Sequence, residues 1–568
     1  MKLKNIFLCT VGFLALSSCS DKMDYNEYNV YDENYIKEMF GRVGGLMTTI
    51  YNDLDYDFGN YSGAMLSSAT DESVYSHSGN AIEDFYNGAW SPTNAKYTTW
   101  TTCYHGISYC NLLLDEFTGL TFPNYTLDVN YKAEMNQYNN YQYEARWARA
   151  YFYFELVRQY GGVPLKTTNM SATEANNLPR VSSDSIFQFI DDECVAIKDS
   201  IIKDYTDLGS LALAVAENGR ANNLAVLALR ARAALYHASP LFNPTNDKEL
   251  WHQAALRNQE LITACKSRSM SLSTDYSTLF NNDSWKNADA QKELIFGRRT
   301  AASNAFEKYN FPIGMENAGG GNCPTENLVE AYEMTNGKAI DETGSGYDAN
   351  NPYTGRDKRL ALTIARNGEL WPNSNTTALQ TYQGGANGEP ISYATPTGYY
   401  LKKYCNASTI IKTTGATSFY HIWVTFRLGE FYLNYAEAML NYTGDGYTST
   451  SDLSMTAADA INVVRKRAGQ PNMATGLSAS VFKTKYENER FVELAFEGHR
   501  FFDVRRWKEA PTYFNTIKEM YITKATDGTL TYSPQTLQTR SWDDKMYLFP
   551  IPQSEIQKAG SLTQNPGW

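Results

Sequence analysis

The sequence predicts a mainly α-helical protein in which a TPR-like scaffold of helix pairs carries a loop-rich, irregular subdomain. Apolar residues recur at helical spacing in several long segments. In the first half of the chain these segments pair across short turns at a spacing of roughly 34 to 40 residues, which is typical of helix-pair repeats, although no copy has a complete TPR signature. Between residues 270 and 420 the composition shifts to Gly, Asn, Thr, Ser, Tyr and Pro. Long loops inside a compact protein are usually functional.

The amino terminus has the pattern of a processed export signal. Lys2 and Lys4 precede an apolar run over residues 6–16, which is too short to cross a bilayer. Small residues then lead to Cys19, an arrangement that resembles a bacterial lipobox. We therefore expect residues 1–18 to be a signal peptide and Cys19 to be acylated, which would anchor the chain firmly to a membrane. Acidic residues after Cys19 resemble a surface-export tag, and the alternative is an ordinary secretory peptide with a chance cysteine.

Four helices are predicted with clear ends. One covers residues 145–156 and stops at the Gly-Gly-Val-Pro of residues 161–164, and an Ala-rich helix over residues 224–238 stops at Pro240. A third covers residues 428–439, and a fourth begins at a Thr456–Asp459 capping box and ends at Gly469. Further helices are expected near residues 34–55, 96–117, 184–203, 248–266 and 483–500.

Composition excludes some classes of protein. The chain has 568 residues, a net charge of -12 and a pI near 5.2, and this acidic balance argues against nucleic-acid binding. Its aromatic content is 14%, with 42 Tyr and 10 Trp, whose flat faces suit surfaces that stack on sugars or peptides.

Cys103 and Cys110 lie about 10 Å apart along a predicted helix, too far for a disulfide, and the other cysteines are scattered. No later apolar run reaches transmembrane length.

No motif predicts catalysis, a metal or a cofactor. Glu489, Glu493 and Glu497 could be read as glycosidase carboxylates, but they alternate with Arg490 and Arg500 on one predicted helix, which is typical of structural ion pairs. The six His lack zinc-ligand spacing, and HExxH and GxSxG are absent. The glycines at residues 319–321 are not followed by Lys-Ser/Thr, so they do not form a P-loop.

Several segments along nearly the whole chain together resemble the SusD/RagB family of Bacteroidetes outer-membrane nutrient-binding lipoproteins. The most diagnostic is Glu497-Gly498-His499-Arg500-Phe501-Phe502-Asp503-Val504-Arg505-Arg506-Trp507. The others include Cys19, Thr70-Asp71-Glu72, Trp100 with Ile107 and Asn111, Glu144-Ala145-Arg146, Tyr160-Gly161-Gly162-Val163-Pro164-Leu165, Leu178-Pro179-Arg180, Gly219-Arg220-Ala221, the stretches at residues 427–438, 461–469 and 547–552, and the terminal Gln564-Asn565-Pro566-Gly567-Trp568.

This resemblance implies a lipid-anchored lid on the extracellular side of the cell outer membrane. Such a lid binds oligosaccharide or polysaccharide without altering it and passes it to a SusC-like TonB-dependent barrel transporter. It also implies that residues 19–270 form the anchored region with TPR-like helix pairs, residues 271–420 an irregular ligand-binding subdomain, and residues 421–568 the C-terminal helical part.

In the family the ligand face uses the loop after the Thr-Asp-Glu element and the central loops, and the resemblance places the candidate ligand contacts of this chain there. These loops offer Asp71, Tyr75, His77, Asn80, Arg366, Trp371, Tyr382 and Tyr393, and Asp57, Asn60 and Trp90 are further candidates. Tyr75 and His77 stand where a starch-binding relative has its stacking aromatics, which puts a starch ligand in doubt. Two alternatives remain open at this point: a peptide-binding lid of the same family, and a surface glycoside hydrolase.

Overall fold

The computed structural model describes residues 33–96, 99–212, 219–280 and 283–568. The predicted signal peptide and the acylation site Cys19 lie outside the described residues. Within those ranges, every helix is too short or too polar to span a membrane.

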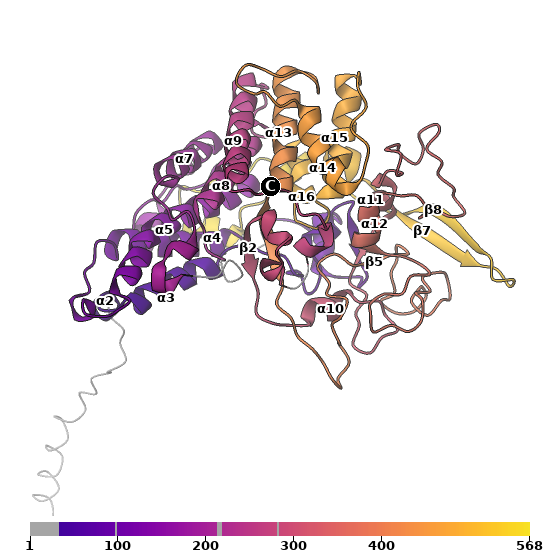
Figure 1. Ribbon diagram of the computed structural model, residues 1–568, viewed down its shortest axis with the longest axis horizontal. Coiled ribbons are helices and arrows are strands. Elements are labelled where there is room, and N and C mark those ends of the chain that lie inside the picture. The colour runs from indigo at the N-terminus through magenta and orange to yellow at the C-terminus, as the bar shows by residue number, and fades with distance from the viewer. Residues whose placement is uncertain (1–32, 97–98, 213–218, 281–282) are drawn as a thin grey trace, which may run out of the picture.

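Long helices form one continuous array, seen at the left and top of Figure 1. In chain order they are α3 (Phe40–Asn52), α4 (Thr99–Glu116), α5 (Tyr131–Tyr160), α7 (Ser183–Ile197), α8 (Asn223–Ala238), α9 (Lys248–Ser267), α13 (Leu428–Thr443), α14 (Ala457–Ala468) and α15 (Ala479–Glu493). Successive members pack on each other: α4 on α5, α5 on α7, α7 on α8, and α8 on α9. This arrangement confirms the predicted mainly α fold with TPR-like helix pairs.

The loop-rich segment is an insertion into this array. Helix α9 packs against α13, although the chain between them is the whole central segment. The strands and α-helices of its described residues are short: β2 (Leu294–Arg299), α10 (Ala305–Asn310), β3 (Asn322–Pro324), α11 (Glu326–Ala331), α12 (Lys358–Thr363), β4 (Ile364–Ala365), β5 (Tyr400–Leu401) and β6 (Ile422–Arg427). Outside the insertion, the described residues also form the short α-helices α2 (Glu33–Lys37), α6 (Ala172–Asn176), α16 (Arg500–Arg506), α17 (Ala510–Tyr513) and α18 (Gln553–Lys558).

The described strands form four two-stranded antiparallel ladders, and two of them join distant parts of the chain. The pairs are β1 (Ser73–Tyr75) with β3, β2 with β6, β4 with β5, and β7 (Thr516–Lys524) with β8 (Leu530–Thr539). The β1–β3 pair fixes an N-terminal loop against the central insertion. The β7–β8 hairpin projects beside the insertion, at the right of Figure 1.

The helical array and the inserted segment each have an apolar core. The larger lies among the long helices and includes Trp147 and Trp251. The smaller fills the inserted part around Leu328 and Tyr399, and it also takes Met520 from β7. The inserted loops are therefore packed on a core of their own, which the C-terminal part of the chain helps to build.

Local sequence signals set several helix ends as predicted. The Thr456 side chain accepts a hydrogen bond from the Asp459 amide in a complete capping box, and Gly469 closes α14 with φ 74°. The expected helix over residues 483–500 is wrong in its extent, because α15 ends at Glu493. Phe496 and Gly498 then adopt φ 62° and 77°, a left-handed conformation that no helix can continue through.

Candidate functional site

Three aromatic residues singled out from the sequence form one stack, which we call the aromatic stack: Tyr75, His77 and Tyr393. The ring centroids of Tyr75 and His77 are 5.0 Å apart, and those of His77 and Tyr393 are 3.9 Å apart with planes inclined by 14°. Tyr75 is 5% exposed and Tyr393 is 54% exposed, so the stack runs from the core to the surface. Its outer ring is a flat aromatic surface open to solvent.

Strand pairing positions the inner ring. Tyr75 ends β1 and pairs with Asn322 of β3. Its hydroxyl donates a hydrogen bond to the Ser62 carbonyl at 3.2 Å. Burial raises the pKa of Tyr75 to about 12, so the phenol stays protonated and remains a donor near neutral pH.

A glycine loop positions the middle and outer rings. His77 Nε2 lies 2.6 Å from the Gly319 carbonyl, and because a carbonyl can only accept, this nitrogen carries the proton. Gly320 has φ 79°, and a Cβ there would collide with the Tyr393 carbonyl oxygen. The glycines excluded above as a phosphate loop thus allow the backbone of Tyr393 to approach closely enough for its ring to stack on His77.

Tyr309 flanks the inner end of the stack. It belongs to α10 and is 41% exposed. A Cβ on Gly63 would meet both the Tyr75 hydroxyl and the Tyr309 ring, so these two side chains converge on Gly63. Sequence reasoning missed Tyr309, since the exposure of a residue in so short a helix depends on tertiary packing.

Three predicted ligand contacts are buried supports instead. Asp57 accepts hydrogen bonds from the backbone amides of its own loop, including that of Leu66 at 2.6 Å. Asp71 forms an ion pair with Arg500 at 2.7 Å, and Trp90 packs its ring against aromatic neighbours in the large core. At 7%, 3% and 4% exposure respectively, Asp57, Asp71 and Trp90 offer little surface to a polymer. Short polar or aromatic residues near a loop do not by themselves reveal which way they face.

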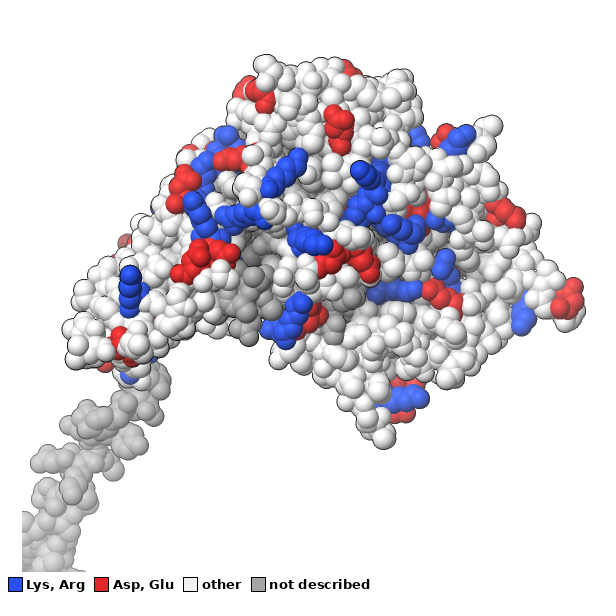
Figure 2. All heavy atoms as spheres, in the orientation of Figure 1, with Lys and Arg blue, Asp and Glu red and all other residues white. Residues whose placement is uncertain are grey.

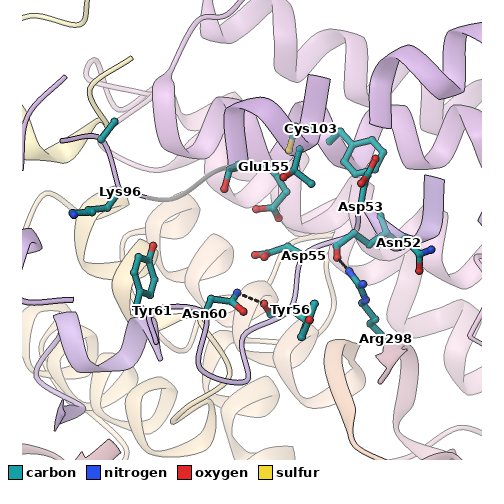
Figure 3. A pocket seen from close by; sticks show the side chains of 15 residues that line it. Asn52, Asp53, Asp55, Tyr56, Asn60, Tyr61, Lys96, Cys103, Glu155 and Arg298 are labelled. Carbon is teal, nitrogen blue, oxygen red and sulfur yellow. Dashed lines mark hydrogen bonds between the residues drawn. The ribbon is translucent and has the colours of Figure 1, made fainter. Parts of the chain in front are cut away.

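The two predicted asparagines have different roles. Asn80 caps the short 3₁₀ helix at Ala81–Phe85, and its side chain donates a hydrogen bond to the Tyr61 carbonyl at 2.9 Å. Asn60 is exposed and donates to the Tyr56 carbonyl at 2.5 Å. Asn60 also lines a separate pocket between the segment that follows α3 and helices α4 and α5 (Figure 3).

The three predicted residues of the central loops other than Tyr393 stand apart from the stack. Arg366 pairs with Glu369 at 3.5 Å, and the Tyr382 hydroxyl donates to Gln380 at 2.9 Å. Trp371 is 7% exposed and borders a cavity of about 300 Å³ together with Lys402. Among the residues that the structure describes, no ring contact or hydrogen bond links Arg366, Trp371 or Tyr382 to the aromatic stack.

The carboxylates that resembled a glycosidase pair are locked in a buried ion network. Arg427 donates to Glu493 and Glu497 at 2.7 Å each, and Arg359 donates to Glu493 at 2.8 Å. Burial favours the protonated form, but the guanidinium groups of Arg467, Arg427 and Arg359 outweigh it and hold the pKa of Glu493 well below its usual range. The structural interpretation is confirmed, but its geometry is corrected: Glu497 lies beyond the end of α15, and the arginine partners come from other elements.

Surface charge is mixed on the face shown in Figure 2. Basic and acidic side chains lie side by side there, and the described residues on that face form no extended basic patch. Nucleic-acid binding depends on such a patch.

Comparison with known proteins identifies relatives along most of the chain. A model described as the SusD family matches residues 284–568, and one described as starch-binding associating with outer membrane matches residues 19–235. No curated protein matches the chain.

Solved structures share the fold at low sequence identity. A SusD-like protein from Bacteroides fragilis is 23% identical, with a TM-score of 0.73 over 94% of this chain and 98% of that one. A SusD-like carbohydrate binding protein from the same species is 22% identical, with a TM-score of 0.73 over 93% and 100% of the two chains. Surface glycan-binding protein A from Bacteroides uniformis is 18% identical, with a TM-score of 0.62 over 93% and 99%.

Proposed function

The chain belongs to the SusD family, and from this premise we propose that it binds an oligosaccharide or polysaccharide and leaves it uncleaved. The ligand binds at the aromatic stack, where a sugar ring packs on the exposed face of Tyr393. Apolar faces of sugars suit aromatic platforms, and a few polar groups at the edge fix the hydroxyls.

The observation that carries this proposal is the geometry of the two outer rings. Tyr393 lies nearly parallel to His77 at 3.9 Å, yet more than half of it is exposed. Tyr393 also adopts φ 65°, which is uncommon for a bulky residue and is typical of functional loops. A tyrosine that stacks on His77 in an unfavourable backbone conformation, with its ring exposed to water, is a suitable binding surface.

We extend the proposal to location and partner. The chain is anchored through acylated Cys19 in the outer membrane, faces the extracellular side, and hands its ligand to a SusC-like TonB-dependent barrel transporter. The description of the family that matches residues 19–235, as associating with the outer membrane, supports the membrane part of this proposal.

The chain carries out no hydrolysis in this proposal. The glutamates at residues 489, 493 and 497 are at most 5% exposed and are neutralised by arginine or lysine. A glycosidase needs two carboxyl groups open to the substrate.

Isothermal titration against a panel of neutral oligosaccharides and short peptides tests the proposal. Tyr393→Ala should weaken oligosaccharide binding about tenfold or more without lowering the melting temperature, because truncating an aromatic anchor typically costs about 1–2 kcal/mol or more. The matched control is Tyr35→Ala, which removes another exposed tyrosine on α2 and should leave binding unchanged.

Three results would reject the proposal. They are binding of peptides alone, equal effects of the two tyrosine substitutions, and shortened saccharide products after incubation with the purified protein.

A further inference from the structure

A groove between three helices of the array lies apart from the residues that form the aromatic stack. It encloses about 400 Å³, within the size range of small-ligand sites, and its lining comes from α7, α8 and α9. Helix α8 packs against both α7 and α9, and the C-terminal half of α8 forms the floor of the groove. The small side chains of Ala233 and Ala234 on this floor leave space between the two walls.

Positive charge exceeds negative charge in an ion cluster at this groove. Arg230 pairs with Asp191 at 2.6 Å and with Glu260 at 2.8 Å. Arg257 approaches Asp191 at 3.4 Å, and Lys198 pairs with Glu260. Among the described residues these three cations pair only with the two carboxylates, so one positive charge in the cluster has no counter-charge.

Arg257 is the cation of this cluster that can take a ligand. Its side chain is 26% exposed and lines the groove. Within the described part of the chain its guanidinium group makes no hydrogen bond, whereas that of Arg230 makes three. A guanidinium group has five N–H donors in a planar fork that matches a carboxylate. The groove therefore offers free donors and a positive charge to an anionic ligand.

The rest of the lining favours a peptide over a sugar. Leu250 and the alanines of the floor are apolar. The Phe187 ring stacks on His237, with centroids 4.8 Å apart and planes inclined by 14°, and it also packs against Phe242 at 5.1 Å. Because other aromatic side chains already cover this ring, it is a poor platform for a sugar. An apolar wall beside a free guanidinium group suits a peptide that has both carboxylates and apolar side chains.

We propose that this groove binds an acidic peptide segment. One carboxylate of the segment pairs with Arg257, and a neighbouring apolar side chain packs between Leu250 and the alanine floor. The ligand thus supplies the counter-charge that the ion cluster lacks. The inference does not depend on the proposed function of the aromatic stack, because the two sites share no residue.

Isothermal titration of the purified chain with three probes tests the site. The acidic probe is the tetrapeptide Leu-Glu-Leu-Asp with a free carboxyl terminus, and its neutral counterpart is Leu-Gln-Leu-Asn with an amidated terminus. The two peptides have nearly the same size, so the acidic one should bind at least tenfold more tightly because it alone can form the ion pair. The third probe is an oligogalacturonide, which carries carboxylates on a sugar chain.

Variants assign peptide binding to this groove. Arg257→Gln removes the charge and should weaken binding of the acidic peptide at least tenfold. Gln253→Glu places a negative charge on the same wall, and it provides the same test if the first variant does not fold. The matched control is Arg42→Gln, which changes an arginine of α3 with 25% side-chain exposure and should leave peptide binding unchanged. Tyr393→Ala should also leave it unchanged, which separates this site from the stack.

Equal affinity for the acidic and the neutral peptide would overturn the proposal. So would peptide binding that survives both groove substitutions, the absence of peptide binding, or binding of the oligogalacturonide in place of the peptide.

Discussion

Glu72 lies at the base of β1, next to the residues that carry the aromatic stack, and its burial predicts a pH-dependent stability. The residue is 1% exposed, and its Oε1 accepts a hydrogen bond from the Phe496 amide at 3.1 Å. Burial is the main cause that raises the pKa of Glu72 to about 8, although Arg500 and Lys403 act in the opposite direction. The substitution Glu72→Gln keeps an oxygen that can accept the hydrogen bond from the Phe496 amide, but its side chain has no titratable proton.

The sign and size of the effect follow from proton linkage. Because the folded-state pKa of Glu72 is raised, the stability it contributes is complete below its unfolded value of 4.5 and is lost as the pH rises to about 8. The loss is about 1.4 kcal/mol per pH unit well below the folded pKa and half of that at the pKa, which gives about 2 kcal/mol between about pH 6 and about pH 8. Groups that do not interact with Glu72 titrate alike in the two proteins and cancel in the difference.

Urea denaturation followed by tryptophan fluorescence, with the midpoint and m value recorded at each pH, measures this difference. The stability of Glu72→Gln relative to the unsubstituted chain should rise by about 2 kcal/mol over that interval. The control Glu38→Gln changes an exposed side chain and should not reproduce the pH dependence. A constant difference between the Glu72 variant and the unsubstituted chain at every pH would refute the reasoning.

Four further predictions concern single substitutions. Glu493→Gln should destabilise the fold by about 3–5 kcal/mol at neutral pH, because it leaves buried arginines uncompensated, and a change under 1 kcal/mol in urea titration would contradict this. Gly320→Ala should weaken oligosaccharide binding in calorimetry by displacing Tyr393 from its partner, whereas unchanged affinity would show that the glycine loop does not position the ring. Trp371→Ala should cost about 3–5 kcal/mol of stability with little change in affinity, since the side chain is buried; lost affinity at unchanged stability would instead make it a ligand contact. Cys19→Ala should move the protein from the membrane fraction to the soluble fraction, and retention in the membrane would argue against acylation at that residue.

Sequence patterns predicted the structure best where it depends on interactions between residues close in the chain. The Thr456 capping box and Gly469 are within one helix, so both ends of α14 could be predicted from a few neighbouring residues. The glycine after α5 likewise ends that helix in a conformation without a Cβ penalty, at φ 70°. The helical spacing of apolar residues also predicted the helix pairs, because each helix has to bury one face.

The arrangement of the candidate site could not be predicted from such patterns. Tyr75, His77 and Tyr393 could be proposed separately, but only the β1–β3 pairing and the close approach of Gly320 bring their rings together. Trp90 is as aromatic as Tyr393, yet it packs in the core.

The sequence alone determined the helical class, several helix ends and the set of chemical groups available, since these depend on residues close in the chain. Only the tertiary structure decided which of those groups face solvent, that Arg359 and Arg427 neutralise Glu493, and that Arg257 lines a groove between three helices. Burial and ion pairing depend on contacts between residues far apart in the chain, and short-range periodicity carries no information about them.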